Sequence, residues 1–502
     1  MDRFICIHAH FYQPPRDNPW LAEVETQESA HPYHDWNERI TAECYSPNTR
    51  SPILDERGAV VRTLNNYSKI SFNFGPTLLS WMETHHPDVY GAIVQADKES
   101  RASFSGHGSA IAQVYNHMIM PLADRKDKET QVKWGIADFE SRFGRHPEGM
   151  WLPETASDLE SLEILAENSI KFTLLDPQQA GRVRQIGEEK WSDVEGGRID
   201  TKSSYLCILP SGRSINIFFY DRSISHDVAF AGLLNNGEVL ARRLVAGFTQ
   251  DKRTQLVSIA TDGETYGHHH RYGDMALAYC LNHIESNKVA RLTNYGEFLQ
   301  KSPPEFEVQT VENTSWSCAH GVERWRSNCG CSFQQATNWS QEWRGPLREA
   351  MNWLKDSLDA VFELQGSRYL FDPWRARDDY VHVMLDRRQR VADRFLQRHL
   401  KARISEEVVE SVLDLMEMER YAMLMFNSCG WFWDEISRIE TVQIMRYAAR
   451  AIQLARQTTS VDLESEFLRI IEAAPSNNPQ LRNGAQVYQM LVKSAVPQIV
   501  RR

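Results

Sequence analysis

The chain has 502 residues, of which 42% are hydrophobic and 25% charged, and its formal net charge is −11. This length exceeds the range in which a single hydrophobic core usually grows, so we expect two or more domains. The acidic balance disfavours a nucleic-acid surface, which is usually basic. The sequence contains no apolar run near the roughly 20 residues that cross a bilayer, and it leads directly into a predicted strand. We therefore expect a cytoplasmic protein that binds neither nucleic acid nor a membrane, whose oligomeric state stays open.

The predicted elements change character once along the chain. From residue 1 to 285, short β-branched runs alternate with helical stretches, which predicts an α/β domain built on a parallel sheet or barrel. From 346 to 502 apolar residues recur at three- and four-residue spacing, which predicts an α-helical bundle domain. The stretch between them, 286–345, is rich in turn formers and aromatic residues, and we expect it to be a junction.

The first predicted strand ends in an unusual group of polar side chains. Residues 5–14 read ICIHAHFYQP, so a short apolar run is followed by His8, His10 and Gln13. Histidines of a packed core rarely occur as such a group. We interpret this strand end as part of a binding site.

Two carboxylates follow apolar runs in the same α/β region. Glu154 ends the segment WLPE, and Asp262 opens the segment DGETYG. A single acidic residue in such a place more often caps a helix or pairs with a cation, but the histidines of the first strand favour a functional reading. Two such groups on opposite faces of a sugar act as nucleophile and acid/base when their environments separate their pKa values. The apolar run before Asp262 predicts a raised pKa for that carboxyl, and we interpret Glu264 as a supporting residue.

These motifs resemble those of glycoside hydrolase family 57. The resemblance runs in the family's order over roughly the first half of the chain, through residues 5–14, 72–79, 117–122, 143–154 and 262–267. It implies a distorted (β/α)7 barrel followed by an α-helical domain. It also implies a retaining hydrolase or transglycosylase of the amylase, 4-α-glucanotransferase or branching type, which acts on an α-glucan or malto-oligosaccharide without a cofactor. The region after about 300 resembles an extension of uncertain role found in one branch of the family.

The resemblance also implies roles for individual residues. Glu154 falls at the family's catalytic nucleophile and Asp262 at its general acid/base. His8 and His10 fall on histidines that line the glycone subsite. One departure is that residues 105–109 read SGHGS where many members carry Gly-Gln-x-Glu, so that a substrate-contacting carboxylate is missing. The expected substrate contacts are His8, His10, Gln13, His107, His117, Trp151, Glu264, His268, Trp316, His320 and Trp325, with Asp221, Arg222 and His226 as further candidates.

Two other classes of function compete with this one. The first is metal-dependent chemistry on a sugar, as in a deacetylase or a mannosidase-type hydrolase. The first strand offers His8 and His10 with no adjacent acid, which disfavours that chemistry. The second is a glycan-binding protein without catalysis, and the presence of both Glu154 and Asp262 argues against it.

A separate group of potential metal ligands lies in the junction. Cys318, His320, Cys329 and Cys331 form the pattern Cys-x-His-x8-Cys-x-Cys. A bound zinc, a disulfide and a reduced, packed loop remain open, and we favour the reduced loop without a metal because paired cysteines of common zinc modules have two or more residues between them. Trp316 and Trp325 give the same segment the composition of a sugar-contacting loop.

Overall fold

The computed structural model describes residues 2–333, 338–402 and 405–497, and they form two compact units. The first unit contains Met1–Gln13, Thr26–Val114 and Phe139–Trp316. The second contains Pro14–Glu25, Tyr115–Asp138 and Ser317–Arg502. Two short segments from the N-terminal half thus belong to the same unit as the C-terminal helices. Within the described ranges, no helix combines the length and apolarity that a membrane span requires.

The first unit is built on a closed wall of parallel strands. β1 (Arg3–Phe11) lies between β12 (Gln255–Asp262) and β4 (Ser71–Phe74). The wall continues through the pair Phe72↔Ala110 to β5 (Ala112–Gln113) and β6 (Met150–Trp151), and through Gly149↔Phe172 to β7 (Phe172–Leu175) and β11 (Ser214–Phe219). The amide of Asp221 after β11 donates to the carbonyl of Ser258 in β12 at 2.7 Å, which closes the ring. The predicted seven-stranded α/β barrel is confirmed.

The sequence explains why these strands form the interior of the unit. In β1, every residue after Arg3 is buried, as expected for a parallel strand that is covered on both faces. Two of the connecting helices begin at polar N-caps. The side chain of Asp158 accepts a hydrogen bond from the amide of Ser161 at the start of α6, and that of Asp221 accepts one from the amide of Ile224 at the start of α7. The helices of this unit are α1 (Trp36–Ile40), α2 (Ser46–Thr49), α3 (Pro76–His85), α4 (Pro87–Ser103), α6 (Leu159–Glu167), α7 (Arg222–Phe230), α8 (Gly237–Val245), α9 (Gly273–Ser286) and α10 (Tyr295–Lys301).

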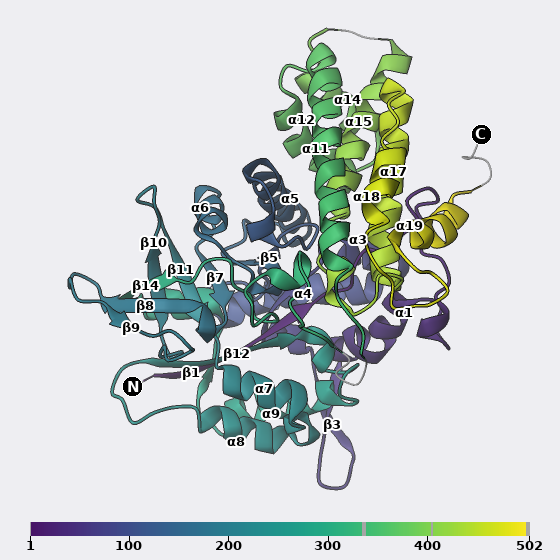
Figure 1. The fold of residues 1–502 in the computed structure, drawn as a ribbon. Helices are drawn as coiled ribbons and strands as arrows, with labels where there is room; N and C mark the ends of the chain where they lie inside the picture. The colour runs from purple at the N-terminus through teal and green to yellow at the C-terminus, as the bar shows by residue number, and fades with distance from the viewer. Residues whose placement is uncertain (1, 334–337, 403–404, 498–502) are drawn as a thin grey trace. The chain divides into compact units, whose positions relative to one another are not determined.

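A second sheet extends from the barrel wall. β7 and β11 continue into β10 (Ser204–Ile208), β14 (Phe306–Thr310), β8 (Ala180–Gln185) and β9 (Ser192–Asp193), in that spatial order (Figure 1). β10 pairs antiparallel with the barrel strand β11, and this pairing joins the second sheet to the barrel. β2 (Ser51–Leu54) and β3 (Val60–Leu64) form a separate hairpin, and β13 (Arg291–Leu292) pairs with the start of β1.

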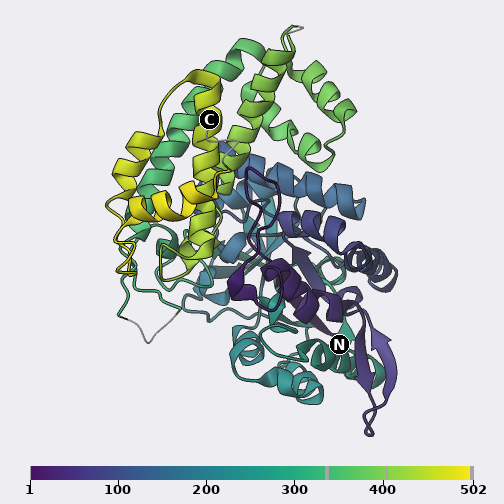
Figure 2. The same cartoon turned by 90° about the vertical axis from the view of Figure 1, so that its right-hand side faces the viewer.

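The second unit is helical. Its three longest C-terminal helices, α11 (Arg344–Tyr369), α15 (Glu406–Leu424) and α17 (Ile439–Thr459), pack side by side (Figure 1, Figure 2). The shorter ones are α12 (Pro373–Asp379), α13 (Val381–Leu385), α14 (Gln389–His399), α16 (Cys429–Phe432), α18 (Glu464–Ile471) and α19 (Gly484–Val487). α5 (Arg125–Phe143) is divided between the two units.

A buried ionic network ties the segment Tyr115–Asp138 to these helices. The guanidinium of Arg377 donates to Asp127 at 2.7 Å and to Glu419 at 2.9 Å, and the ammonium of Lys355 lies 3.2 Å from Asp127. All four side chains are buried. Removing one member of such a network leaves an unpaired charge in the interior, so the network favours one arrangement of these elements.

Candidate active site

The ends of the barrel strands bring polar side chains together at one mouth of the first unit. Because parallel strands share their C-terminal end, residues that terminate different strands meet there. The register of β1 with β12 places His10 beside Asp262, and that of β1 with β4 places His10 beside Asn73. Gln113, Trp151, Asp176 and Tyr220 stand at or directly after the ends of β5, β6, β7 and β11.

A chain of hydrogen bonds fixes the two histidines of β1. His8 contacts Ser71 Oγ through Nδ1 at 3.0 Å and Asn73 Oδ1 through Nε2 at 3.1 Å. The amide nitrogen of Asn73 donates to His10 Nδ1 at 2.9 Å and to Gln113 Oε1 at 2.8 Å. Burial lowers the pKa of both imidazoles to about 3, so both are neutral. His10 therefore carries its proton on Nε2, since Nδ1 accepts from Asn73.

Trp151 packs against both His8 and His10. Its indole is 0% exposed and stacks on His8 with a centroid distance of 5.0 Å and on His10 at 4.8 Å. The ring of Trp316 meets it edge-on at 5.1 Å. Because Trp151 has no exposed surface, it positions the histidines and Trp316 instead of contacting a ligand itself.

Glu154 is held in a backbone conformation that few residues adopt. It follows β6 in the 3-10 turn Pro153–Thr155, with φ 59° and ψ 19° in the left-handed region. Such conformations persist where the surroundings determine them, and they concentrate at functional sites. Trp316 holds Glu154 through two hydrogen bonds. The amide of Trp316 donates to the carbonyl of Glu154, and its indole Nε1 donates to the carboxylate Oε2, both at 3.0 Å.

Asp262 and Glu264 experience a different environment from Glu154. Asp262 is exposed at the end of β12, yet partial desolvation by the surrounding protein raises the pKa of its carboxyl to about 7, and the negative charge of Glu154 adds to this effect. Glu264 is buried and accepts from the hydroxyl of Tyr45 at 2.5 Å and from the amide of Tyr12 at 3.0 Å. Burial raises the pKa of Glu264 to about 8. The raised pKa values favour the protonated forms of Asp262 and Glu264 near neutral pH.

A further network at this mouth was not expected from the sequence. Asp176, directly after β7, accepts from the hydroxyl of Tyr220 at 2.5 Å and from the guanidinium of Arg222 at 3.0 Å. Of these residues, only Arg222 was a candidate. The sequence does contain a pattern that predicts Asp176. Residues 172–176 read FTLLD, an apolar run that ends in an acidic residue, as the runs that end at Glu154 and Asp262 do. Asp221, another candidate, caps α7.

The remaining expected contacts of the first unit lie in different places. Gln13 follows β1 at the mouth, and His268 follows β12, where its Nδ1 pairs with Glu43. The expectation that His107 contacts the substrate is corrected by its position. His107 precedes β5 and pairs at 2.8 Å with Glu148, which precedes β6, so it lies at the opposite end of the strands from Glu154.

Three expected contacts belong to the second unit. His117 is buried and its Nδ1 bonds the hydroxyl of Ser428 at 2.6 Å. His320 lies among three cysteines. Trp325 is 0% exposed, which corrects the expectation that its ring stacks on a sugar, because a fully buried indole is a packing residue.

Comparison with known families agrees with this geometry. The family model described as "Glycosyl hydrolase family 57" matches residues 6–310, which is more than half of the chain. The chain belongs to glycosyl hydrolase family 57. A second model, "Domain of unknown function (DUF3536)", matches residues 339–501. The C-terminal helices of this family 57 chain therefore correspond to a separately recognised domain.

Individual relatives of this family 57 chain are distant. Alpha-amylase 1 of Dictyoglomus thermophilum is 23% identical over 198 residues, which cover 39% of this chain and only 26% of the relative. The exo-type maltose-forming amylase from Pyrococcus sp. ST04 has a TM-score of 0.71 at 17% identity, over 100% of this chain and 94% of that one. The branching enzyme from Thermococcus kodakaraensis has a TM-score of 0.55 at 15% identity, over 99% and 96% of the two chains. At these identities the solved structures establish a shared fold.

The burial of Glu264 predicts a pH-dependent stability in this family 57 chain. Its pKa in the folded state is about 8, against an ordinary value of 4.5. The folded state therefore holds its proton more tightly, and stability falls as the pH rises through this window. Glu264→Gln removes this loss. The Tm of the variant minus the Tm of wild type should therefore be larger at pH 8.5 than at pH 4.5, by at least about 2 °C. Thermal scans by circular dichroism measure the difference.

The matched control is Glu160→Gln, an exposed glutamate of α6. Its Tm should track that of wild type at both pH values. A Glu264→Gln variant whose offset from wild type is the same at pH 4.5 and pH 8.5 would contradict the assignment.

Proposed function

We propose that this chain is a retaining glycoside hydrolase or transglycosylase that acts on α-glucans, with Glu154 as nucleophile and Asp262 as general acid/base. The observation that carries the proposal is the pairing of two carboxyls in unlike environments at one barrel mouth. The pKa of Asp262 is raised to about 7, while Glu154 accepts a hydrogen bond from Trp316. A hydrogen bond to the charged form favours ionisation, which a nucleophile requires. The amylase and the branching enzyme that share the fold support an α-glucan as the substrate class.

In the proposed first step, a carboxylate oxygen of Glu154 attacks the anomeric carbon while Asp262 gives its proton to the glycosidic oxygen. The bond to the leaving sugar breaks and a glycosyl ester of Glu154 forms. In the second step Asp262 takes a proton from water or from a sugar hydroxyl, whose oxygen displaces Glu154 and restores its carboxylate. Retention requires the two carboxyls to lie about 5–5.5 Å apart, since a separation of about 6.5–9.5 Å leaves room for the water of an inverting enzyme.

Other side chains at the mouth have supporting parts in this proposal. The Nε2–H of His10, together with Gln13 and His268, is assigned to sugar hydroxyls. His8, Trp151 and Glu264 hold these groups in place, and Trp316 aims Glu154. Both ring nitrogens of His8 are engaged by Ser71 and Asn73, which disfavours the alternative of a metal-dependent hydrolase with a ligand at this position.

The division of labour is tested with two substrates. On a malto-oligosaccharide, Asp262→Asn should lower kcat by about 10²–10⁴-fold, because the leaving sugar needs a proton. On an α-glycosyl fluoride, whose leaving group needs none, the first step should survive in Asp262→Asn and be lost in Glu154→Gln. For wild type on the oligosaccharide, kcat/KM should fall as the pH rises above about 7, where Asp262 loses its proton.

Fluoride release and steady-state kinetics provide these measurements, with Glu160→Gln as the variant expected to behave as wild type. Because the second step also needs Asp262, the first step is measured as the burst of fluoride in a single turnover. An Asp262→Asn variant without this burst would contradict the assigned acid/base.

Hydrolysis and transfer diverge only at the second step. Incubation with maltoheptaose, followed by sizing and linkage analysis of the products, separates them. Chains longer than the substrate mean that a sugar hydroxyl reaches the glycosyl ester first, and a new linkage type means branching. Only shorter chains mean hydrolysis. No change in maltoheptaose at any enzyme concentration would contradict an α-glucan substrate of this kind.

A further inference from the structure

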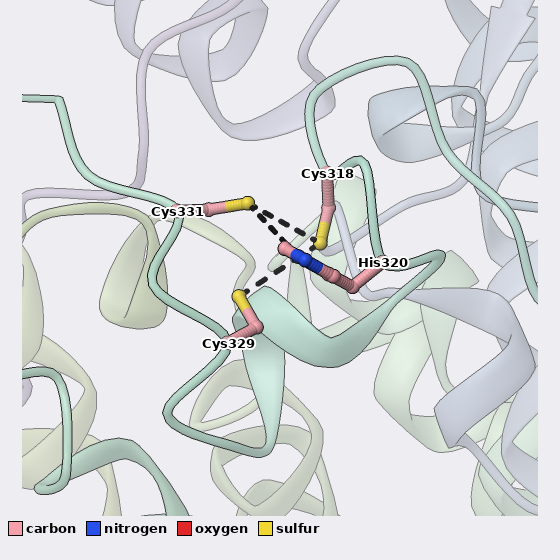
Figure 3. Close-up of side chains that lie close together, drawn as sticks. All are labelled: Cys318, His320, Cys329 and Cys331. Carbon is pink, nitrogen blue, oxygen red and sulfur yellow. Dashed lines mark hydrogen bonds between the residues drawn. The ribbon is translucent and has the colours of Figure 1, made fainter.

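Four potential metal ligands converge in the second unit. Cys318, His320, Cys329 and Cys331 each offer one ligand atom, and these atoms all lie within 4.8 Å of one another (Figure 3). The sulfurs of Cys331 and Cys318 are 3.8 Å apart, those of Cys318 and Cys329 are 4.0 Å apart, and Cys331 Sγ lies 3.5 Å from His320 Nδ1. The group lies within Ser317–Ser332, whereas Glu154 and Asp262 belong to the first unit.

Three of the six separations match the edges of a zinc tetrahedron, and all six are within 4.8 Å. Bond lengths of about 2.3 Å to sulfur and about 2.0 Å to nitrogen give edges of about 3.8 Å between two sulfurs and about 3.5 Å between sulfur and nitrogen. The three measured distances lie within a few tenths of an ångström of these values. The ligand set, three cysteines and one histidine, is also one that structural zinc sites use.

Two glycines explain how such short ligand spacing can converge. Gly321, directly after His320, has φ 81°, and Gly330, between Cys329 and Cys331, has φ 80°. Both lie in the left-handed region, where glycine meets no steric penalty, so the chain can turn sharply beside each ligand pair. The unusual Cys-x-His and Cys-x-Cys spacing, which favoured a packed loop in the sequence, is therefore compatible with a single ion.

The surroundings of the sulfurs suit thiolates. The backbone amides of His320 and Arg324 lie close to the sulfur of Cys318, and the amide of Ala319 lies close to that of Cys331. Amide donors of this kind orient metal-bound thiolates and stabilise their charge.

Two buried arginines add positive charge beside the cluster. Arg344 donates to the carbonyl of Cys331 at 3.2 Å and to that of Trp433 at 3.0 Å. Arg324 donates to the carbonyl of Phe432 at 2.8 Å. Asp434 already lies 4.0 Å from Arg344 and balances one of these cations. Three thiolates around a divalent ion have a net charge of −1, which balances the other.

We propose that Cys318, His320, Cys329 and Cys331 bind one zinc ion in a closed structural site. Binding forms three bonds to sulfur and one to nitrogen, and the three thiols release their protons to solvent. Four protein ligands leave no open position for substrate, so the ion fixes the loop 317–333 instead of taking part in chemistry. The next residues dock on the helical unit, because Ser332 and Phe333 donate to Asp434 at 2.9 and 3.1 Å. This assignment replaces both the metal-free loop and the sugar contact expected for His320.

The metal content of the full chain tests the site directly. The protein is expressed with added zinc, purified under reducing conditions without a chelator, and measured by inductively coupled plasma mass spectrometry. Wild type should contain one zinc per chain. Cys331→Ser should contain at least about tenfold less, while Cys429→Ser, at a half-buried cysteine of the same unit outside the cluster, should retain it.

Two further measurements cover the case in which a variant misfolds. His320→Cys should keep one zinc per chain, because four cysteines are also a common zinc set, whereas His320→Ala should lose it. Cobalt-loaded wild type should show the absorption of tetrahedral thiolate coordination, with stronger sulfur-to-metal charge transfer in His320→Cys. Wild type that retains less than about a tenth of an equivalent after incubation with zinc, or zinc content that is unchanged in Cys331→Ser, would overturn the proposal. So would a disulfide between two cluster cysteines in protein whose thiols are alkylated at lysis, before any reductant is added.

Discussion

The parallel pairing of β1 with β12 is the constraint on which the candidate site depends. It sets His10 beside Asp262, while β4 on the other side of β1 sets Asn73 beside His10. Asp262 and Asn73 lie on β12 and β4, which are buried over nearly their whole length. A slip of one residue would turn every side chain of β1 to the opposite face, so the hydrophobic core and the site specify the same register. Burial of the apolar strand residues therefore stabilises the register that brings these polar side chains together.

The closed barrel also separates the environments of the carboxyls. Asp262 ends an apolar strand, where partial desolvation and the charge of Glu154 favour its protonated form. Glu154 stands in a turn whose left-handed backbone is held by Trp316, which donates to both its carbonyl and its carboxylate. The strain of that turn and the burial of Glu264 reduce stability, and they are tolerated because the surrounding wall is well packed. The two aromatic side chains Trp151 and Trp316 connect this electrostatic arrangement to the core.

Much of the fold could be read from local patterns, because each long strand carries its apolar run and its polar terminus in one short stretch, as residues 5–14 do. The placements that failed depend on distant parts of the chain. Nothing local shows that His107 faces the opposite end of the strands, since β5 has only two residues, or that Trp325 is buried in the helical unit. The ionic network of Asp127, Lys355, Arg377 and Glu419 is likewise assembled from separate segments. The zinc-like geometry of the cysteines required the two left-handed glycines, which ligand spacing alone does not reveal.

The most direct test of the account is to trap the covalent intermediate on Glu154. A 5-fluoro-α-glucosyl fluoride slows the second step more than the first, so a retaining enzyme accumulates its glycosyl ester. Digestion and mass spectrometry of wild type should then locate one fluoroglucosyl group on the peptide that contains Glu154, and the Glu154→Gln variant should carry none. An adduct on another residue, or complete turnover of malto-oligosaccharides with inversion at the anomeric carbon, would contradict the central claim.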